Sequence, residues 1–142
     1  MRANLVLMGA AACLAATPAL AQDFTPEQII QRHVDAANRG DTAAMAGDYA
    51  EDAQILEQGR AIHGRAAIKA AFDGIFGANA KAKFTVTPTR IWSDGETGFI
   101  TWTANDGAVK GSDTFLVRHG RIIAQAVFFM GGPAAGAPRS GN

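Results

Sequence analysis

Cysteine is almost absent from this sequence. The single one, Cys13, lies in an N-terminal segment that we expect to be removed from the mature protein. The folded domain would then have no disulfide, no thiolate nucleophile and no cysteine metal ligand. We therefore expect its core to be held together by packing alone.

An excess of charge of either sign is also missing. The 142 residues carry 13 basic and 13 acidic side chains, and neither sign forms a run. Such a chain produces no field that would attract a phosphate backbone or an anionic membrane surface. We therefore expect neither nucleic acid nor a membrane as a partner of the mature protein.

The long apolar run at the N-terminus is too short to span a membrane. Arg2 supplies a positive start, residues 5–16 are mostly apolar, and Ala19-Leu20-Ala21 fits the small-x-small pattern that signal peptidase accepts. A spanning helix needs ~20 apolar residues. We predict a signal peptide over residues 1–21 and a periplasmic or secreted protein.

Two alternatives exist for this segment. The apolar run can stay in place as a membrane anchor, although its length argues against this. Cys13 can instead be a lipidation site, but Ala10 stands three residues before it, where lipoproteins usually have Leu. Cleavage after Ala21 is the interpretation that the residues favour.

Patterns for metal, phosphate and nucleophile chemistry are lacking as well. His33, His63 and His119 do not have the spacing of metal ligands. No Ser or Thr lies in a nucleophile elbow, and the glycines form no phosphate-binding loop. We expect no metal and no cofactor.

Strong helix signals are present in the first half of the chain. Thr25 is suited to be an N-cap, Pro26 takes the first helical position, and Gln28 stands at the return position of a capping box. Apolar residues then recur at three- and four-residue spacing until Gly40, which suits a left-handed helix end. The pattern predicts a long first helix, and two further helices over about residues 42–49 and 65–76.

After residue 83 the apolar period changes to two, which is typical of strands. Runs of β-branched and aromatic residues cover 84–92, 97–103 and 113–130, the last broken by a turn at His119-Gly120. An earlier strand is centred on Ile55. We predict an α+β fold in which a cone-shaped, curved antiparallel sheet wraps around the long N-terminal helix.

The predicted cone domain spans residues 22–130. The remaining residues, 131–142, are mostly Gly, Pro, Ala and Ser, with nothing to pack. We expect this tail to be disordered.

Four polar residues stand in phase with buried neighbours. His33 lies on the apolar face of the first helix, and Asp113 alternates with Phe115 and Val117. Gln125 alternates with Ile123, Val127 and Phe129, and Glu57 follows Ile55 by two. A buried carboxyl group without partners has a raised pKa, which makes it a proton donor or a base near neutral pH. These residues are the candidates for a site inside the cone.

The order of elements and several stretches resemble a known family. The stretches are QRHVDAANRGD (31–41), YAEDA (49–53), IHGRAAI (62–68), DTFLV (113–117) and GRI (120–122). Over residues 29–129 the chain resembles the nuclear-transport-factor-2-like cone fold, and within it SnoaL-like domains and ketosteroid isomerase. The same fold hosts isomerases, cyclases, dehydratases, binding domains and assembly domains.

The resemblance to ketosteroid isomerase implies roles for three residues. Glu57 falls at the position of the general base, and His33 and Asp113 fall at the positions of the two oxyanion donors. Two of the three residue types differ from that enzyme, because Glu replaces Asp and His replaces Tyr. We expect Gln125, Tyr49, Trp102 and Phe115 to contact the ligand.

Two functions follow from this resemblance. The first is an exported domain that binds a small, largely apolar molecule in its cone. The alternative is a cofactor-independent isomerase, cyclase or lyase that abstracts a proton next to a carbonyl group. Cones of this family commonly pair through the exposed face of the sheet, which implies a homodimer and leaves a third possibility, an assembly domain.

Overall fold

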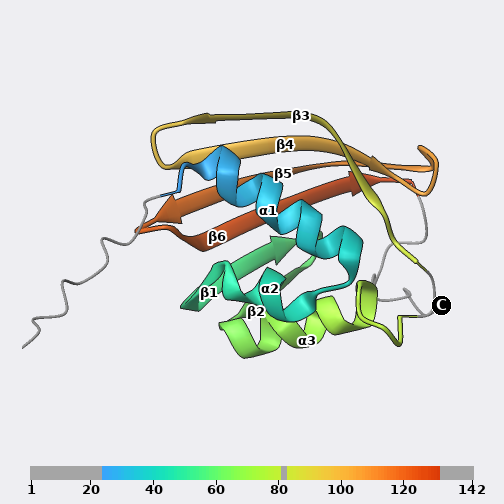
Figure 1. Ribbon diagram of the computed structural model, residues 1–142, viewed down its shortest axis with the longest axis horizontal. Coiled ribbons are helices and arrows are strands. Elements are labelled where there is room, and N and C mark those ends of the chain that lie inside the picture. The colour runs from blue at the N-terminus through green and yellow to red at the C-terminus, as the bar shows by residue number, and fades with distance from the viewer. Residues whose placement is uncertain (1–23, 81–82, 132–142) are drawn as a thin grey trace, which may run out of the picture.

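The computed structural model describes residues 24–80 and 83–131. The predicted signal peptide and almost all of the predicted tail lie outside these residues. The chain forms three helices and six strands, shown in Figure 1: α1 (Pro26–Arg39), α2 (Thr42–Gly47), β1 (Tyr49–Glu57), β2 (Arg60–His63), α3 (Arg65–Ile75), β3 (Val86–Asp94), β4 (Thr97–Ala104), β5 (Val109–Arg118) and β6 (Arg121–Met130).

Helix α1 begins and ends as its sequence predicts. The Thr25 side chain accepts a hydrogen bond from the Gln28 backbone, and the Gln28 side chain accepts one from the Thr25 backbone. Gly40 ends the helix with φ of 71°, a conformation that a side chain would disfavour. Both ends of the longest helix are therefore fixed by local chemistry.

The six strands form one sheet in the order β2-β1-β6-β5-β4-β3. Strands β3 to β6 make the predicted antiparallel meander, but β1 pairs with β6 in parallel. The predicted antiparallel meander is confirmed, and the parallel β1–β6 pair makes the sheet mixed. The long connection from β1 to β6 permits the parallel pairing, which a short turn would forbid.

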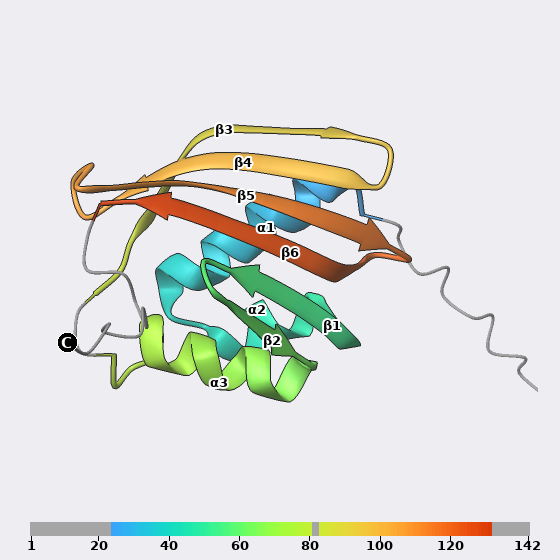
Figure 2. The same cartoon turned by 180° about the vertical axis from the view of Figure 1, so that it is seen from behind.

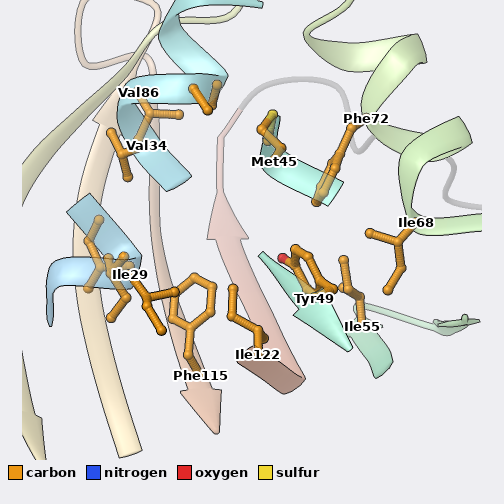
Figure 3. Close-up of a cluster of buried hydrophobic side chains, with 14 of the residues drawn as sticks. Ile29, Val34, Met45, Tyr49, Ile55, Ile68, Phe72, Val86, Phe115 and Ile122 are labelled. Atoms are coloured by element: carbon orange, nitrogen blue, oxygen red, sulfur yellow. The ribbon is translucent and has the colours of Figure 1, made fainter. Parts of the chain in front are cut away.

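The curved sheet wraps around α1, as Figures 1 and 2 show. Helix α1 packs against β3, β4 and β5, while α3 packs against β1 and β2. Figure 3 shows the core between these layers, where Ile29, Tyr49, Ile68 and Phe115 are almost completely buried. Each such side chain contributes about 1.5–3 kcal/mol by leaving water. The α+β cone is the predicted fold.

Two local expectations were wrong. Helix α2 ends at Gly47, so Tyr49 opens β1 instead of closing the helix. In β6, Ile123 is an extra residue that has no partner in β5. It lies between two consecutive pairs of the ladder, Leu116↔Ala124 and Val117↔Ile122. This irregularity turns Ile122, and not Ile123, to the buried side occupied by Gln125.

Asn38 joins the end of α1 to the start of β3. Its side-chain amide donates to the Val86 carbonyl oxygen at 2.8 Å and accepts from the Val86 N–H at 2.8 Å. The Asn38 side chain therefore pairs with both backbone groups of Val86, the first residue of β3.

We predict that Asn38→Ala lowers the free energy of unfolding by about 2–3 kcal/mol, because it leaves a partly buried donor and acceptor without partners. Urea denaturation monitored by circular dichroism measures the change. Gln31→Ala, on an exposed position of the same helix, is the control and should change stability by less than about 0.5 kcal/mol. Equal effects of the two substitutions would contradict the role assigned to Asn38.

Candidate functional site

A cavity of about 260 Å³ lies inside the cone, between the helices and the inner face of the sheet. Its walls are mainly apolar, and its volume is slightly below the ~300 Å³ lower end of typical small-molecule pockets. The polar side chains that line it come from α1, from strands β1, β4, β5 and β6 and from the turn after β4: His33, Glu57, Trp102, Asn105, Asp113 and Gln125.

Asp113 is held in the cavity wall by two donors. The indole Nε1 of Trp102 donates to its Oδ1 at 3.2 Å, and the amide Nε2 of Gln125 donates to its Oδ2 at 3.1 Å. Burial raises the pKa of Asp113 to about 7, although the two hydrogen bonds lower it, and the nearby charge of Glu57 adds to the rise. The carboxyl group can therefore gain or lose a proton near neutral pH.

Tyr49 fixes the orientation of Gln125. The buried Tyr49 hydroxyl donates to the Gln125 Oε1, so the amide nitrogen is left to face Asp113. Burial and the charges of Asp113 and Asp48 raise the pKa of Tyr49 well above its ordinary value. The hydroxyl thus keeps its proton. Both hydrogen bonds are donated toward Asp113, the first from Tyr49 to Gln125 and the second from Gln125 to Asp113.

His33 reaches the cavity from the middle of α1. Only 6% of the residue is exposed, and its ring packs edge to face against Tyr49, Phe72 and Phe115. Its Nδ1 lies 3.4 Å from the Asp48 Oδ2. The imidazole is therefore immobilised between three aromatic rings and a carboxylate.

Glu57 lies at the end of β1 and borders the cavity. Its side chain is 16% exposed and forms an ion pair with Arg60, with 2.6 Å between Oε2 and Nε. Arg60 belongs to β2, which pairs directly with β1 at this position. A cation thus balances the Glu57 charge, whereas Asp113 has only neutral donors.

The structure places the predicted site residues in two groups. His33, Glu57, Trp102, Asp113 and Gln125 line the cavity. A second group lies behind this wall: Tyr49 reaches it through Gln125, and Phe115 packs against the His33 ring.

Sequence reasoning did not identify Asp48. This residue is 3% exposed and bonds to Arg32 as well as facing His33. It stands between a short helix and a strand, where an acidic residue is normally part of a solvated turn. The sequence therefore held no signal that would have singled it out.

Within residues 24–80 and 83–131, no group of three or more His, Cys, Asp or Glu side chains is arranged to hold a metal ion. No helix in the same part of the chain combines the length and apolarity that crossing a membrane requires. The chemistry considered below uses protein side chains.

Comparison with protein families identifies the domain. The family model of the SnoaL-like domain matches residues 30–125. The chain therefore belongs to the SnoaL-like domain family, as its resemblance predicted. No curated protein matches the sequence.

Solved structures share the fold at low sequence identity. A putative polyketide cyclase from Sinorhizobium meliloti has a TM-score of 0.62 and 22% identity over 70% of this chain and 93% of its own. A putative ketosteroid isomerase from Kribbella flavida has a TM-score of 0.63 and 17% identity over 80% of this chain and 84% of its own.

A third structure is the epoxide hydrolase/cyclase-like enzyme SalBIII, which acts in pyran ring formation in the polyether salinomycin. Its TM-score is 0.60, with 24% identity over 72% of this chain and 88% of its own. At these identities the likeness establishes the fold. Members of this family are often isomerases or cyclases, and their fold alone does not assign a reaction.

We predict that Asp113→Asn changes how stability depends on pH. Because the pKa of Asp113 is raised in the folded state, the folded protein holds a proton that the unfolded chain releases above about pH 4. This contribution is present below about pH 4 and is lost as pH rises to about 7, at about 1.4 kcal/mol per pH unit. Asp113→Asn has no carboxyl group to titrate at this position, so its stability does not fall in this way.

Urea denaturation at pH values from about 4 to 8 measures the difference between the two proteins. The wild type should lose about 3–4 kcal/mol relative to Asp113→Asn across this range. Asp52→Asn, at an exposed position, is the control and should follow the wild type. Parallel curves for wild type and Asp113→Asn would show that Asp113 titrates normally.

Proposed function

We propose that this protein binds a small, largely apolar molecule in the cone and catalyses proton transfer next to a carbonyl group of that molecule. The observation that carries the proposal is a carboxyl group, Asp113, in an apolar cavity with a pKa of about 7. Such a reaction needs no cofactor, because protein side chains supply and remove the proton.

The cavity walls support an apolar ligand with few polar groups. Phe72, Phe76, Phe84 and Val127 are among the lining residues, and together with other aliphatic side chains they make up most of the surface. The polar groups are concentrated near Asp113 and His33. A ligand would bury its carbon skeleton against the apolar walls and direct its carbonyl group to these residues.

Asp113 suits the role of the proton donor. In its protonated form it can donate a hydrogen bond to the carbonyl oxygen and stabilise the charge that develops there. Trp102 and Gln125 hold both carboxyl oxygens, so the group needs little rearrangement before reaction. This role agrees with the one that the family resemblance implies.

Two groups in the cavity can accept the proton from carbon. Glu57 is the candidate that the resemblance implies, and its ion pair with Arg60 keeps it at the border of the cavity. His33 is the other candidate, and it is the more deeply buried of the two. A second function, ligand binding without chemistry, uses the same residues only to orient the molecule.

We also propose that the protein is exported and dimerises. The N-terminal segment supports export, and fractionation of cells that express the whole chain tests it.

Leu56, Phe128 and Met130 support dimerisation, because they are exposed on the side of β1 and β6 that faces away from the cavity. Light scattering on the mature protein should give twice the monomer mass; a monomer at micromolar concentration would exclude the dimer.

We predict that the protein exchanges acidic α-protons of small ketones for deuterium, and that Asp113→Asn slows this exchange about 100-fold or more. The asparagine amide keeps the shape of the side chain but cannot transfer a proton. NMR in heavy water with a panel of apolar ketones measures the exchange.

The pH profile provides a second test. In the wild type, kcat/KM for exchange should fall above about pH 7, because Asp113 then loses the proton that it donates. Asp113→Asn should lose this alkaline limb, and Asp52→Asn should keep it. If no ketone exchanges with either protein while ligands raise the melting temperature, the protein is a binding domain.

A further inference from the structure

Three side chains in contact lead from the half-exposed Arg32 on α1, through the buried Asp48, to His33 at the cavity. Arg32 donates from Nε to the Asp48 Oδ1 at 2.8 Å, and the Asp48 Oδ2 lies 3.4 Å from the His33 Nδ1. The Asp48 and His33 side chains are 5% and 8% exposed. Neither this Oδ2 nor this Nδ1 makes a hydrogen bond in the described part of the chain, so their contact brings together two buried polar atoms that are otherwise unpaired.

Arg32 determines which oxygen of Asp48 faces His33. A guanidinium group has only donors, and it occupies Oδ1 with Nε and a second nitrogen. The other oxygen is left for the imidazole. Because an ionised carboxylate only accepts hydrogen bonds, the His33 nitrogen beside it must carry the proton.

The second ring nitrogen of His33 is then the one available to a ligand. His33 lines the cavity, while its Nδ1 is the atom that lies beside Asp48. In the neutral imidazole, a proton on Nδ1 leaves a lone pair on Nε2. His33 therefore offers the ligand an acceptor, and not the donor that the family resemblance implies.

We propose that Asp48 is a positioning residue that fixes His33 as the Nδ1–H tautomer, so that Nε2 accepts the proton from the ligand. The inference rests on the proposed function and assigns the proton acceptor within it. When His33 takes the proton it becomes an imidazolium, and the Asp48 carboxylate beside Nδ1 stabilises the new charge.

His33 and Asp113 together account for every proton that moves in the proposed reaction. A C–H bond of the ligand breaks, its proton moves to His33, and its electron pair forms a carbon–carbon double bond. Asp113 gives its proton to the carbonyl oxygen, so the products are an enol, an imidazolium and a carboxylate. When the ligand is a β,γ-unsaturated ketone, the enol is a dienol. The imidazolium then returns its proton to the γ-carbon and the enol proton goes back to Asp113, which yields the conjugated isomer and restores both residues.

This arrangement defines the substrate class more closely. His33 belongs to α1 and Asp113 to β5, on two different walls of the cavity. The substrate should therefore present an acidic C–H to the helix and a carbonyl oxygen to the sheet. Small ketones that hold both groups on one apolar skeleton meet this requirement.

Asp48→Asn tests the inference directly, because Arg32 also determines how the new amide is oriented. The amide oxygen must face the Arg32 donors, so the NH₂ group faces the His33 Nδ1 and donates to it. The imidazole must then accept at Nδ1 and carry its proton on Nε2. The substitution should invert the tautomer without changing the shape of the side chain.

Nitrogen NMR of the imidazole rings in alkaline buffer measures the tautomer, and the chain has only three histidines to assign. A His33→Gln variant identifies the His33 signals. We expect Nδ1 to be protonated in the wild type and Nε2 in Asp48→Asn, with α-proton exchange lowered about 100-fold or more in the variant. Asp52→Asn is the matched control and should match the wild type in both measurements.

Two results would overturn the inference. One is a wild-type His33 protonated at Nε2, and the other is an Asp48→Asn variant that keeps the wild-type tautomer or the wild-type exchange rate. Thermal melting shows whether the variant is folded. An inverted tautomer in a protein that exchanges no ketone even as wild type would instead contradict the proposed function, and with it the acceptor role of His33.

Discussion

The packing of α1 into the concave face of the sheet is the constraint on which the rest of the structure depends. The helix lies so close to β4 that a Cβ atom at Gly98 would stand 2.6 Å from the Ile30 Cδ1. A side chain at this position would force the Ile30 side chain, or the helix that carries it, to move. Because α1 covers β3, β4 and β5 while α3 covers β1 and β2, the space between the two helices is left for the cavity.

A similar close approach forms the polar wall of the cavity. A Cβ atom at Gly111 would stand 2.2 Å from the Trp102 ring, so the indole occupies the space that a side chain on β5 would fill. In this position the indole donates to Asp113, two residues along the same strand. Strand β5 therefore provides, at Gly111, the space for the Trp102 indole and, at Asp113, the group that accepts its hydrogen bond. The acidity of Asp113 depends on this packing, because the hydrogen bonds offset only part of the effect of burial.

The sequence allowed the fold and several polar residues of the cavity wall to be predicted, because both follow from periodicity. The helical phase of His33 and the strand phase of Asp113 were enough to place these side chains inside the cone. Periodicity cannot show which strands become neighbours, so the parallel pairing of β1 with β6 was missed. It also cannot find Asp48, because the burial of this residue depends on Arg32 and His33 meeting a loop that lies 16 and 15 residues further along the chain.

Asp48 and Asp113 show how different partners give two carboxyl groups of one protein different environments. Asp48 has a cationic partner, Arg32, and lies beside an imidazole, so its negative charge is compensated within the protein. Burial raises the pKa of Asp113 to about 7, and its neutral donors, Trp102 and Gln125, reverse only part of this rise, to which the charge of Glu57 adds. A cation beside Asp113 would instead favour its ionised form and lower its pKa. The position of one arginine on α1 thus makes the two carboxyl environments different.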